Sequence, residues 1–226
     1  MDEYLIVTSI DIGTTKTACG FSTRNDFENN PLKVNFLKWE EGVMFGWKTP
    51  SCILFDKQNK FHSYGYEAEE KYAEVLSTGK RGDWFYFRQF KNKFQETVTD
   101  ENEYILESED GKAFPAKIII TSAFRYLKEK LLSEMQLSYP SVENENVKWV
   151  ITVPAMWSNK ARMFFRECAS EAGIQSNHLA IAMESEAAAL YVNYIEEMEE
   201  DRRRTFQSGL KYLICDIGGK CTIKVN

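Results

Sequence analysis

Short apolar, β-branched runs separated by polar stretches dominate the first part of the chain. Residues 4–10 and 16–22 form two such runs on either side of a tight polar turn, which predicts a β-hairpin. Further strand-like runs cover residues 34–39 and 51–55. The polar stretch 23–33 predicts a loop. We therefore expect the chain to open with β-structure.

Helical periodicity becomes prominent in the second half of the chain. After Pro115, apolar residues recur every three or four positions and predict a long amphipathic helix. Residues 147–153 predict a buried strand that Pro154 stops, and helices are expected over 159–172 and 184–198. The other predicted elements are a helix over 67–76, a hairpin over 97–114 and strands over 179–182 and 210–215. Strands that come first and then alternate with helices indicate the α/β class.

Composition and charge narrow the range of functions. A hydrophobic content of 43% supports a sizeable core, and a net charge of −6 argues against a nucleic acid or an anionic membrane as partner. The acidic N-terminus has only a short apolar run, so we expect no signal peptide, and no stretch approaches the length of a membrane span. Five cysteines without C-x-x-C spacing are typical of reduced, buried thiols in a cytoplasmic protein. Two histidines without partner spacing argue against zinc.

The most informative motif is the turn Asp11-Ile-Gly13-Thr14-Thr15, which directly follows the first apolar run. Gly13 permits a tight turn, and the amides and hydroxyls of Thr14 and Thr15 can then face an anionic group. Asp11 stands at the end of the strand, where a carboxylate can hold a water molecule of hydrated Mg²⁺. A plain hairpin turn is the alternative interpretation of this motif.

A second strand followed by Asp-x-Gly comes near the end of the chain, in Tyr212-Leu-Ile-Cys-Asp216-Ile-Gly218-Gly219. Two such elements can clamp the phosphates of a nucleotide from both sides. Asp11 and Asp216 are then the candidate metal residues, holding Mg²⁺ mainly through water. The repetition favours a phosphate site over a plain turn.

Three further stretches accompany the turn, namely Phe61-His-Ser-Tyr-Gly-Tyr-Glu-Ala68, Trp149-Val-Ile-Thr-Val-Pro-Ala155 and Ala182-Met-Glu-Ser-Glu-Ala-Ala-Ala189. In order and spacing the four stretches resemble the actin-like ATPase superfamily, and within it the 70-kDa heat-shock protein family, most of all its heat shock 70 kDa protein 12 subfamily. The resemblance implies an α/β, ribonuclease H-like fold with a mixed sheet flanked by helices. It also implies two lobes around a cleft. Residues 1–204 would form lobe I without its C-terminal crossover helix, and residues 205–226 the truncated opening strand and phosphate loop of lobe II.

The resemblance also assigns roles by position. Glu184 matches the carboxylate near the attacking water, and Lys91 is the candidate for the lysine that reaches the γ-phosphate, with Arg88 as the alternative. Pro154 and Arg162 match residues coupled to interlobe signalling. The phosphate-loop positions are Gly13, Thr14, Thr15 and Lys16 on one side and Gly218, Gly219 and Lys220 on the other. The structural alternatives are a helix-terminal charge for Glu184, a surface position for Lys91 and Arg162, and a strand terminator in Pro154.

The resemblance implies an ATP-binding, chaperone-like domain that takes ATP or ADP with Mg²⁺ and hydrolyses ATP at the cleft. The second phosphate loop departs from the family pattern, because Lys220 replaces a glycine, Cys221 replaces a threonine, and the following acid is absent. Lysine adopts positive φ only at a steric cost, and a hydroxyl contact is lost. These departures favour a slow or inactive ATPase.

Two alternatives to the chaperone-like ATPase stay open. The first is a non-catalytic interaction protein that keeps the fold, and Lys220 and Cys221 motivate it. The second, more remote, is a sugar kinase of the same superfamily, for which no polyol pocket or later catalytic aspartate is recognisable. Besides nucleotide, the resemblance implies client proteins or co-chaperones as partners, with no nucleic acid and no membrane.

Overall fold

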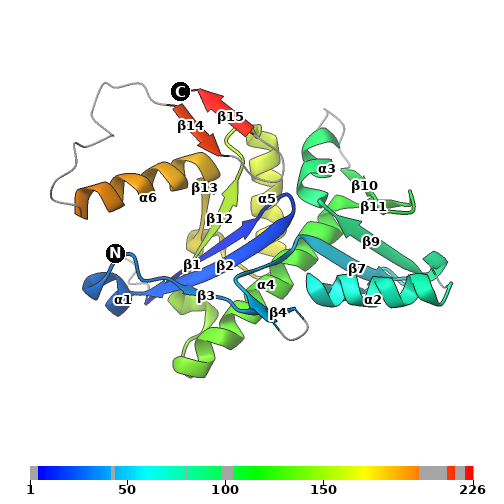
Figure 1. The fold of residues 1–226 in the computed structure, drawn as a ribbon, viewed down its shortest axis with the longest axis horizontal. Coiled ribbons are helices and arrows are strands. Elements are labelled where there is room, and N and C mark those ends of the chain that lie inside the picture. The colour runs from blue at the N-terminus through cyan, green and yellow to red at the C-terminus, as the bar shows by residue number, and fades with distance from the viewer. Residues whose placement is uncertain are drawn as a thin grey trace.

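A six-stranded mixed sheet forms the centre of the computed structural model (Figure 1). The structure describes residues 5–41, 44–79, 81–97, 104–198, 213–216 and 222–225. The strands of this sheet are β1 (Ile6–Ile12), β2 (Lys16–Thr23), β3 (Asn35–Phe36), β6 (Lys48–Pro50), β12 (Val147–Val153) and β13 (Leu179–Met183). Their order is β13-β12-β1-β2-β3, with β6 also paired to β2. β1, β12 and β13 are parallel, while β2 is antiparallel to its neighbours.

The hairpin predicted from residues 4–10 and 16–22 is confirmed as β1 and β2. Ile12 pairs with Thr17, so the turn occupies the residues between them. Along β1, Ile6, Thr8 and Ile10 are buried while the residues between them are more exposed. This alternation is that of a strand with one face in the core. The turn therefore lies at the carboxyl end of β1.

Two helices cover the buried face of this sheet. These are α4 (Ala116–Ser138), which begins directly after Pro115 as predicted, and α5 (Asn159–Glu171), which packs against α4 (Figure 1). Phe124 of α4 and Phe165 of α5 are fully buried in the same core cluster as Trp149 of the sheet. The expected α/β class, with a mixed sheet flanked by helices, is thereby confirmed.

A smaller antiparallel sheet lies beside the central one (Figure 1). It has β7 (Cys52–Asp56) between β8 (Phe61–Tyr64) and β9 (Trp84–Arg88), and α2 (Tyr66–Ser77) packs on it. α3 (Phe90–Thr97) follows β9 directly. The hairpin expected within 97–114 is present as β10 (Ile105–Glu107) and β11 (Ala113–Pro115). Short elements complete this part of the fold: β4 (Trp39–Glu41), β5 (Met44–Gly46), and 3₁₀ turns over Arg81–Asp83, Asn144–Asn146 and Ser176–His178.

The loop predicted over residues 23–33 is wrong in its first half, where the structure has α1 (Arg24–Asn29). A capping box explains the helix: the Thr23 hydroxyl accepts a hydrogen bond from the Asp26 amide at 3.0 Å, and the Asp26 carboxylate accepts one from the Thr23 amide at 3.4 Å. Asp26 is buried and pairs with Lys33 at 2.6 Å. Polar composition alone predicted a loop, whereas the spacing of Thr23 and Asp26 carried the helix signal.

The C-terminal elements are α6 (Glu184–Met198), with the bounds that the sequence predicted, and an antiparallel pair formed by β14 (Leu213–Asp216) and β15 (Thr222–Val225). β14 contacts α6. The predicted boundary between residues 204 and 205 lies outside the described residues and stays a prediction. Within the described part of the chain, no helix is long and apolar enough to cross a membrane.

Three cysteines lie in the core, as their sequence context predicted. Cys19, Cys52 and Cys168 are buried and free of disulfides. Burial raises the pKa of Cys52 and of Cys168 to about 12, and burial together with the nearby Asp11 charge raises the pKa of Cys19 further still. These thiols are therefore protonated packing groups at neutral pH. The side chain of Cys215 and all of Cys221 lie outside the described residues.

Candidate functional site

The candidate site begins at the turn between β1 and β2. The Gly13 amide donates a hydrogen bond to the Lys16 carbonyl at 3.1 Å, which closes the turn. A Cβ atom at Gly13 would lie only 2.6 Å from that carbonyl oxygen, although the φ of Gly13 is not positive. Glycine is therefore required here by close backbone approach, and not by a left-handed conformation.

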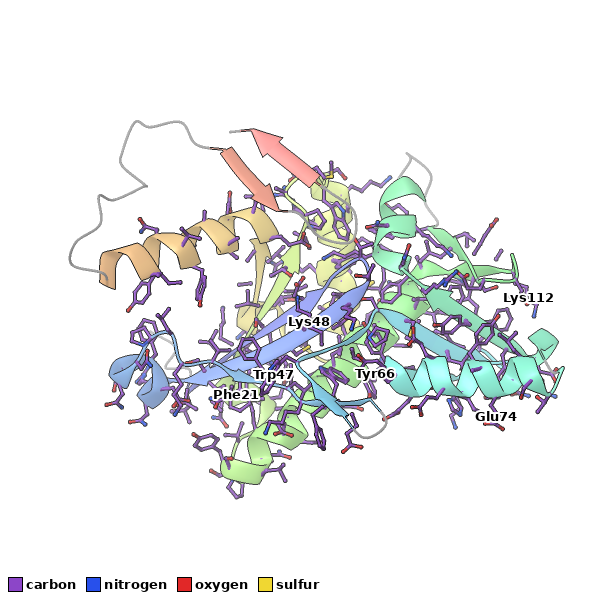
Figure 2. The ribbon with its side chains drawn as sticks, viewed as in Figure 1. Phe21, Trp47, Lys48, Tyr66, Glu74 and Lys112 are labelled. Carbon is purple, nitrogen blue, oxygen red and sulfur yellow. The ribbon has the colours of Figure 1, made fainter. Side chains whose placement is uncertain are left out.

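The side chains of the turn point in different directions. The Thr14 hydroxyl donates to Oδ1 of Asn92, in the first turn of α3, at 3.0 Å. Thr15 is exposed, and its carbonyl accepts from the Ser51 amide at 2.9 Å. The Lys16 ammonium lies 3.4 Å from the Tyr66 hydroxyl, and Figure 2 shows Tyr66 at the start of α2. Lys16, predicted as a phosphate-loop cation, thus contacts the first residue of α2 in this structure.

Asp11, Thr152 and Glu184 meet at one edge of the central sheet. Each stands at the carboxyl end of a parallel strand, because β1, β12 and β13 are neighbours and Glu184 directly follows β13. The carboxyl ends of parallel strands lie on the same side of a sheet, which is where α/β proteins place their ligands. The Thr152 hydroxyl donates to Oδ1 of the half-buried Asp11 at 2.7 Å.

Lys91 connects these strand ends to α3. Its ammonium lies 2.5 Å from Oε1 of Glu184 and 3.4 Å from the Thr152 carbonyl, and it faces the Trp157 ring at 6.0 Å. The Lys91 side chain is only 3% exposed, whereas that of Glu184 is 29% exposed. Asp11, Thr152, Lys91 and Glu184 therefore form a continuous line of contacts, which we call the strand-end cluster.

The two candidate cations differ sharply in their surroundings. Arg88 is 62% exposed and pairs at 3.0 Å with Glu109, which is not part of the strand-end cluster. Lys91 lies two residues after Gln89, whose φ of +53° is unusual for a residue other than glycine. The Gln89 carbonyl accepts from the Asn92 amide at 3.1 Å, so this strained residue opens the helix that carries both Lys91 and Asn92. The geometry places Lys91, and not Arg88, beside Glu184.

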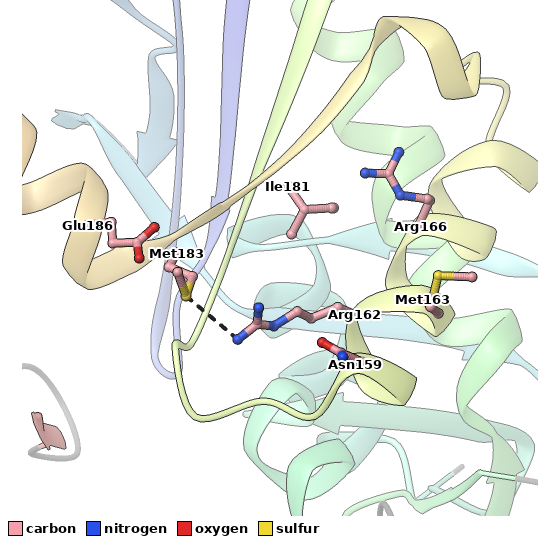
Figure 3. A pocket seen from close by; sticks show the side chains of 7 residues that line it. All are labelled: Asn159, Arg162, Met163, Arg166, Ile181, Met183 and Glu186. Carbon is pink, nitrogen blue, oxygen red and sulfur yellow. Dashed lines mark hydrogen bonds between the residues drawn. The ribbon is translucent and has the colours of Figure 1, made fainter. Parts of the chain in front are cut away.

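Pro154 and Arg162 lie next to the strand-end cluster. Arg162, in α5, donates from Nη2 to the Ala155 carbonyl at 2.9 Å and contacts Sδ of Met183 at 3.6 Å (Figure 3). It therefore links the segment after Pro154 to the last residue of β13, immediately before Glu184. The cavity beside it is lined by residues of α5, β13 and α6.

Several predicted site residues fall outside what the structure describes. Asp216 ends β14, but its side chain is not described, and Gly218, Gly219 and Lys220 lie in residues 217–221. Their meeting with Asp11 across a cleft stays a prediction.

The structure also brings two residues to the site, Thr152 and Asn92, that the sequence did not single out. Thr152 lies within the informative stretch 149–155, but only the strand order reveals that it faces Asp11.

The side chains of the strand-end cluster suit an anionic ligand that carries a hydrated metal ion better than a metal ion ligated directly by the protein. The cluster offers two half-buried carboxylates, Asp11 and the Lys91-paired Glu184, and one buried ammonium, Lys91, beside a glycine turn. Among the described residues, no group of three or more histidines, cysteines or acids could hold a metal ion by itself. Mg²⁺ commonly keeps several waters and uses one or two carboxylates plus substrate phosphates. Asp11 therefore fits a water-mediated contact to phosphate-bound Mg²⁺.

Comparison with known proteins identifies the family to which this part of the chain is related. No family model matches the chain. It is 37% identical over 197 residues to heat shock 70 kDa protein 12B of Homo sapiens, a match that covers 84% of this chain and 28% of that protein. Heat shock 70 kDa protein 12A of Mus musculus is 37% identical over 196 residues, covering 83% of this chain and again 28% of the relative.

Over the matched residues the chain is therefore homologous to heat shock 70 kDa proteins 12A and 12B. This homology confirms the resemblance that the sequence motifs indicated. The chain spans about 28% of the length of these curated relatives. Among solved structures, MreB5 of Spiroplasma citri bound to ADP is similar with a TM-score of 0.48 and 18% identity, over 96% of this chain and 46% of that chain.

Proposed function

We propose that the chain supplies one wall of an ATP-binding site of the 70-kDa heat-shock type, at which ATP is hydrolysed with Mg²⁺. The strand-end cluster beside the Gly13 turn is the observation that carries this proposal. It combines a buried cation, two carboxylates and a backbone turn at the edge where α/β sheets bind ligands. The homology to heat shock 70 kDa proteins 12A and 12B supports the same conclusion.

In this proposal Lys91 and Glu184 have coupled roles. Phosphoryl transfer depends on positioning and charge neutralisation, and a buried ammonium interacts with phosphate oxygens more strongly than an exposed one. A γ-phosphate oxygen near Lys91 competes with Glu184 for the ammonium. Glu184, released from its partner, is then able to orient a water molecule and accept its proton.

The other residues hold the phosphates and the metal. Bound Mg²⁺ would neutralise phosphate charge at this site. Asp11 is the residue of the described chain that would hold it through water, with Asp216 as the proposed second carboxylate. The Gly13 turn directs the backbone of Thr14 and Thr15 toward the same edge, where amide groups suit an anionic ligand.

Nucleotide binding by the purified full-length protein tests the proposal. Calorimetric titration with ATP and ADP, each with and without Mg²⁺, is expected to show binding that Mg²⁺ strengthens. Absence of binding at millimolar nucleotide would reject the proposed site. Titration with GTP under the same conditions shows whether adenine contributes to the affinity.

A non-catalytic interaction protein is the second candidate, and the substitutions Lys220 and Cys221 in the second phosphate loop favour it. It predicts that ATP turnover does not exceed the uncatalysed rate, whether or not nucleotide binds.

The leading proposal also includes a chaperone role with client proteins or co-chaperones and a cytoplasmic location. Suppression of aggregation of an unfolded test protein, with and without ATP, examines the chaperone part.

A further inference from the structure

Thr152 occupies the middle of the strand-end cluster and has two separate contacts. Its hydroxyl donates to Oδ1 of Asp11 at 2.7 Å, and its main-chain carbonyl lies 3.4 Å from the Lys91 ammonium. The residue therefore contacts both the carboxylate proposed for Mg²⁺ and the cation proposed for phosphate. No role follows for it from the sequence motifs alone.

The hydrogen bond to Asp11 has the properties of an orienting contact. A hydroxyl that donates to a carboxylate at 2.7 Å is a charge-assisted hydrogen bond, stronger than one between neutral groups. It engages Oδ1 and restricts the rotation of the carboxylate, so that Oδ2 is held in a fixed direction for a metal-bound water. Groups that hydrogen-bond to a metal-binding residue in this way typically change metal affinity by about 10- to 100-fold.

The sheet gives Thr152 a rigid base. It lies in β12 between β1 and β13, and it is opposite Ala182 of β13 in the parallel ladder. Its main chain is therefore held on both sides, so the direction of its hydroxyl depends only on the side-chain rotamer. A β-branched side chain in a strand has few rotamers available, which favours one fixed hydrogen bond.

We propose that Thr152 is a positioning residue, which holds the Asp11 carboxylate in the orientation that receives hydrated Mg²⁺. This role rests on the proposed nucleotide site. It acts through Asp11 alone, because the Lys91 contact uses the main-chain carbonyl, which every substitution at this position retains. Replacing the hydroxyl therefore tests the effect on Mg²⁺ binding at Asp11 without removing the contact between the main chain and Lys91.

The test compares Thr152→Val, which removes the hydroxyl but keeps the shape, with Thr152→Ser, which keeps the hydroxyl. ADP affinity of the full-length protein is measured by calorimetry at saturating Mg²⁺ and in EDTA. We expect Thr152→Val to weaken ADP binding about tenfold in Mg²⁺ and not in EDTA, and Thr152→Ser to retain the wild-type affinity in both. Thr8→Val is the matched control, because the Thr8 hydroxyl bonds the Lys148 carbonyl at 3.4 Å on the same two strands, away from the cluster.

Three outcomes would overturn the role. Wild-type Mg²⁺ dependence in Thr152→Val, or an equal loss in Thr152→Ser, would show that the hydroxyl does not orient Asp11 while leaving the nucleotide site intact. A wild-type protein that binds no ADP in either condition would instead refute the proposed function, and this role with it. Thr152→Ala provides the same comparison if Thr152→Val does not fold, which thermal melting reports.

Discussion

The Lys91 ammonium lies 2.5 Å from Oε1 of Glu184 and joins the first turn of α3 to the first residue of α6, 93 positions further along the chain. The contact connects α3 to the carboxyl edge of the central sheet. Lys91 is nearly completely buried and Glu184 is not. The lysine is therefore the member of the pair that depends on its partner for charge compensation, while the carboxylate retains access to solvent.

Replacing Lys91 with alanine is expected to reduce both stability and ATP turnover. Removing one partner of a fully buried pair costs about 3–5 kcal/mol, and we expect about 1–2 kcal/mol here because Glu184 remains partly solvated. Loss of a cation that stabilises the transferred phosphate is expected to slow turnover about 100-fold or more. Urea unfolding and single-turnover hydrolysis measure the two effects.

Lys93→Ala is the matched control for that experiment. Lys93 lies on the same helix but pairs with Glu109 at 3.1 Å nearer the surface. Its loss is expected to change stability by less than about 1 kcal/mol and to leave turnover unchanged. Equal effects of the two substitutions would contradict the assignment of Lys91 to the site.

Glu184→Gln is expected to retain nucleotide binding but lower hydrolysis by about 100-fold, because the amide cannot accept a proton from water. Glu186→Gln, two residues further along α6 and exposed, is expected to behave as the wild type. Steady-state phosphate release and ADP titration measure the two properties. Unchanged hydrolysis in Glu184→Gln would favour the non-catalytic alternative.

Gly13→Ala is expected to destabilise the protein by about 1–3 kcal/mol and to weaken nucleotide binding, because the new Cβ would lie 2.6 Å from the Lys16 carbonyl oxygen. Gly82→Ala is the control, since a Cβ at Gly82 has no neighbour within 4 Å and its φ is not positive. That substitution is expected to stay within about 0.5 kcal/mol of the wild type. Thermal melting of the two variants side by side decides whether the turn requires glycine.

The buried Asp26 predicts an acid dependence of stability. Its hydrogen-bonded pair with Lys33 lowers the pKa of Asp26 from 3.8 to about 2, although burial opposes the shift. Because the folded-state pKa is depressed, the stabilisation is present above pH 4 and is lost as the pH falls from about 4 to 2. The difference in unfolding free energy between the wild type and Asp26→Asn is therefore expected to shrink over that interval. A difference that stays constant from pH 6 to pH 2 would argue against the pair.

The sequence alone determined those elements whose signal is local. The β1–β2 hairpin, the start of α4 after Pro115 and the bounds of α6 follow from alternation, helical spacing and caps within a few residues. The turn motif at Asp11 and the relation to heat shock 70 kDa proteins 12A and 12B were also recognisable from the sequence. The helix α1 was missed although its signal, the Thr23 and Asp26 pair, is local, because polar composition outweighed spacing.

Only the tertiary structure decided which side chains meet. The contacts of Thr152 with Asp11, Lys91 with Glu184 and Thr14 with Asn92 join residues 141, 93 and 78 positions apart. They depend on the order β13-β12-β1-β2, which places three parallel strand ends side by side, and on the helix that Gln89 opens. Local propensity fixes the direction of a chain over a few residues, but the pairing of distant strands arises from burial of the whole core. Only the folded sheet therefore shows that Lys91, and not Arg88, lies beside Glu184 and that Thr152 faces Asp11.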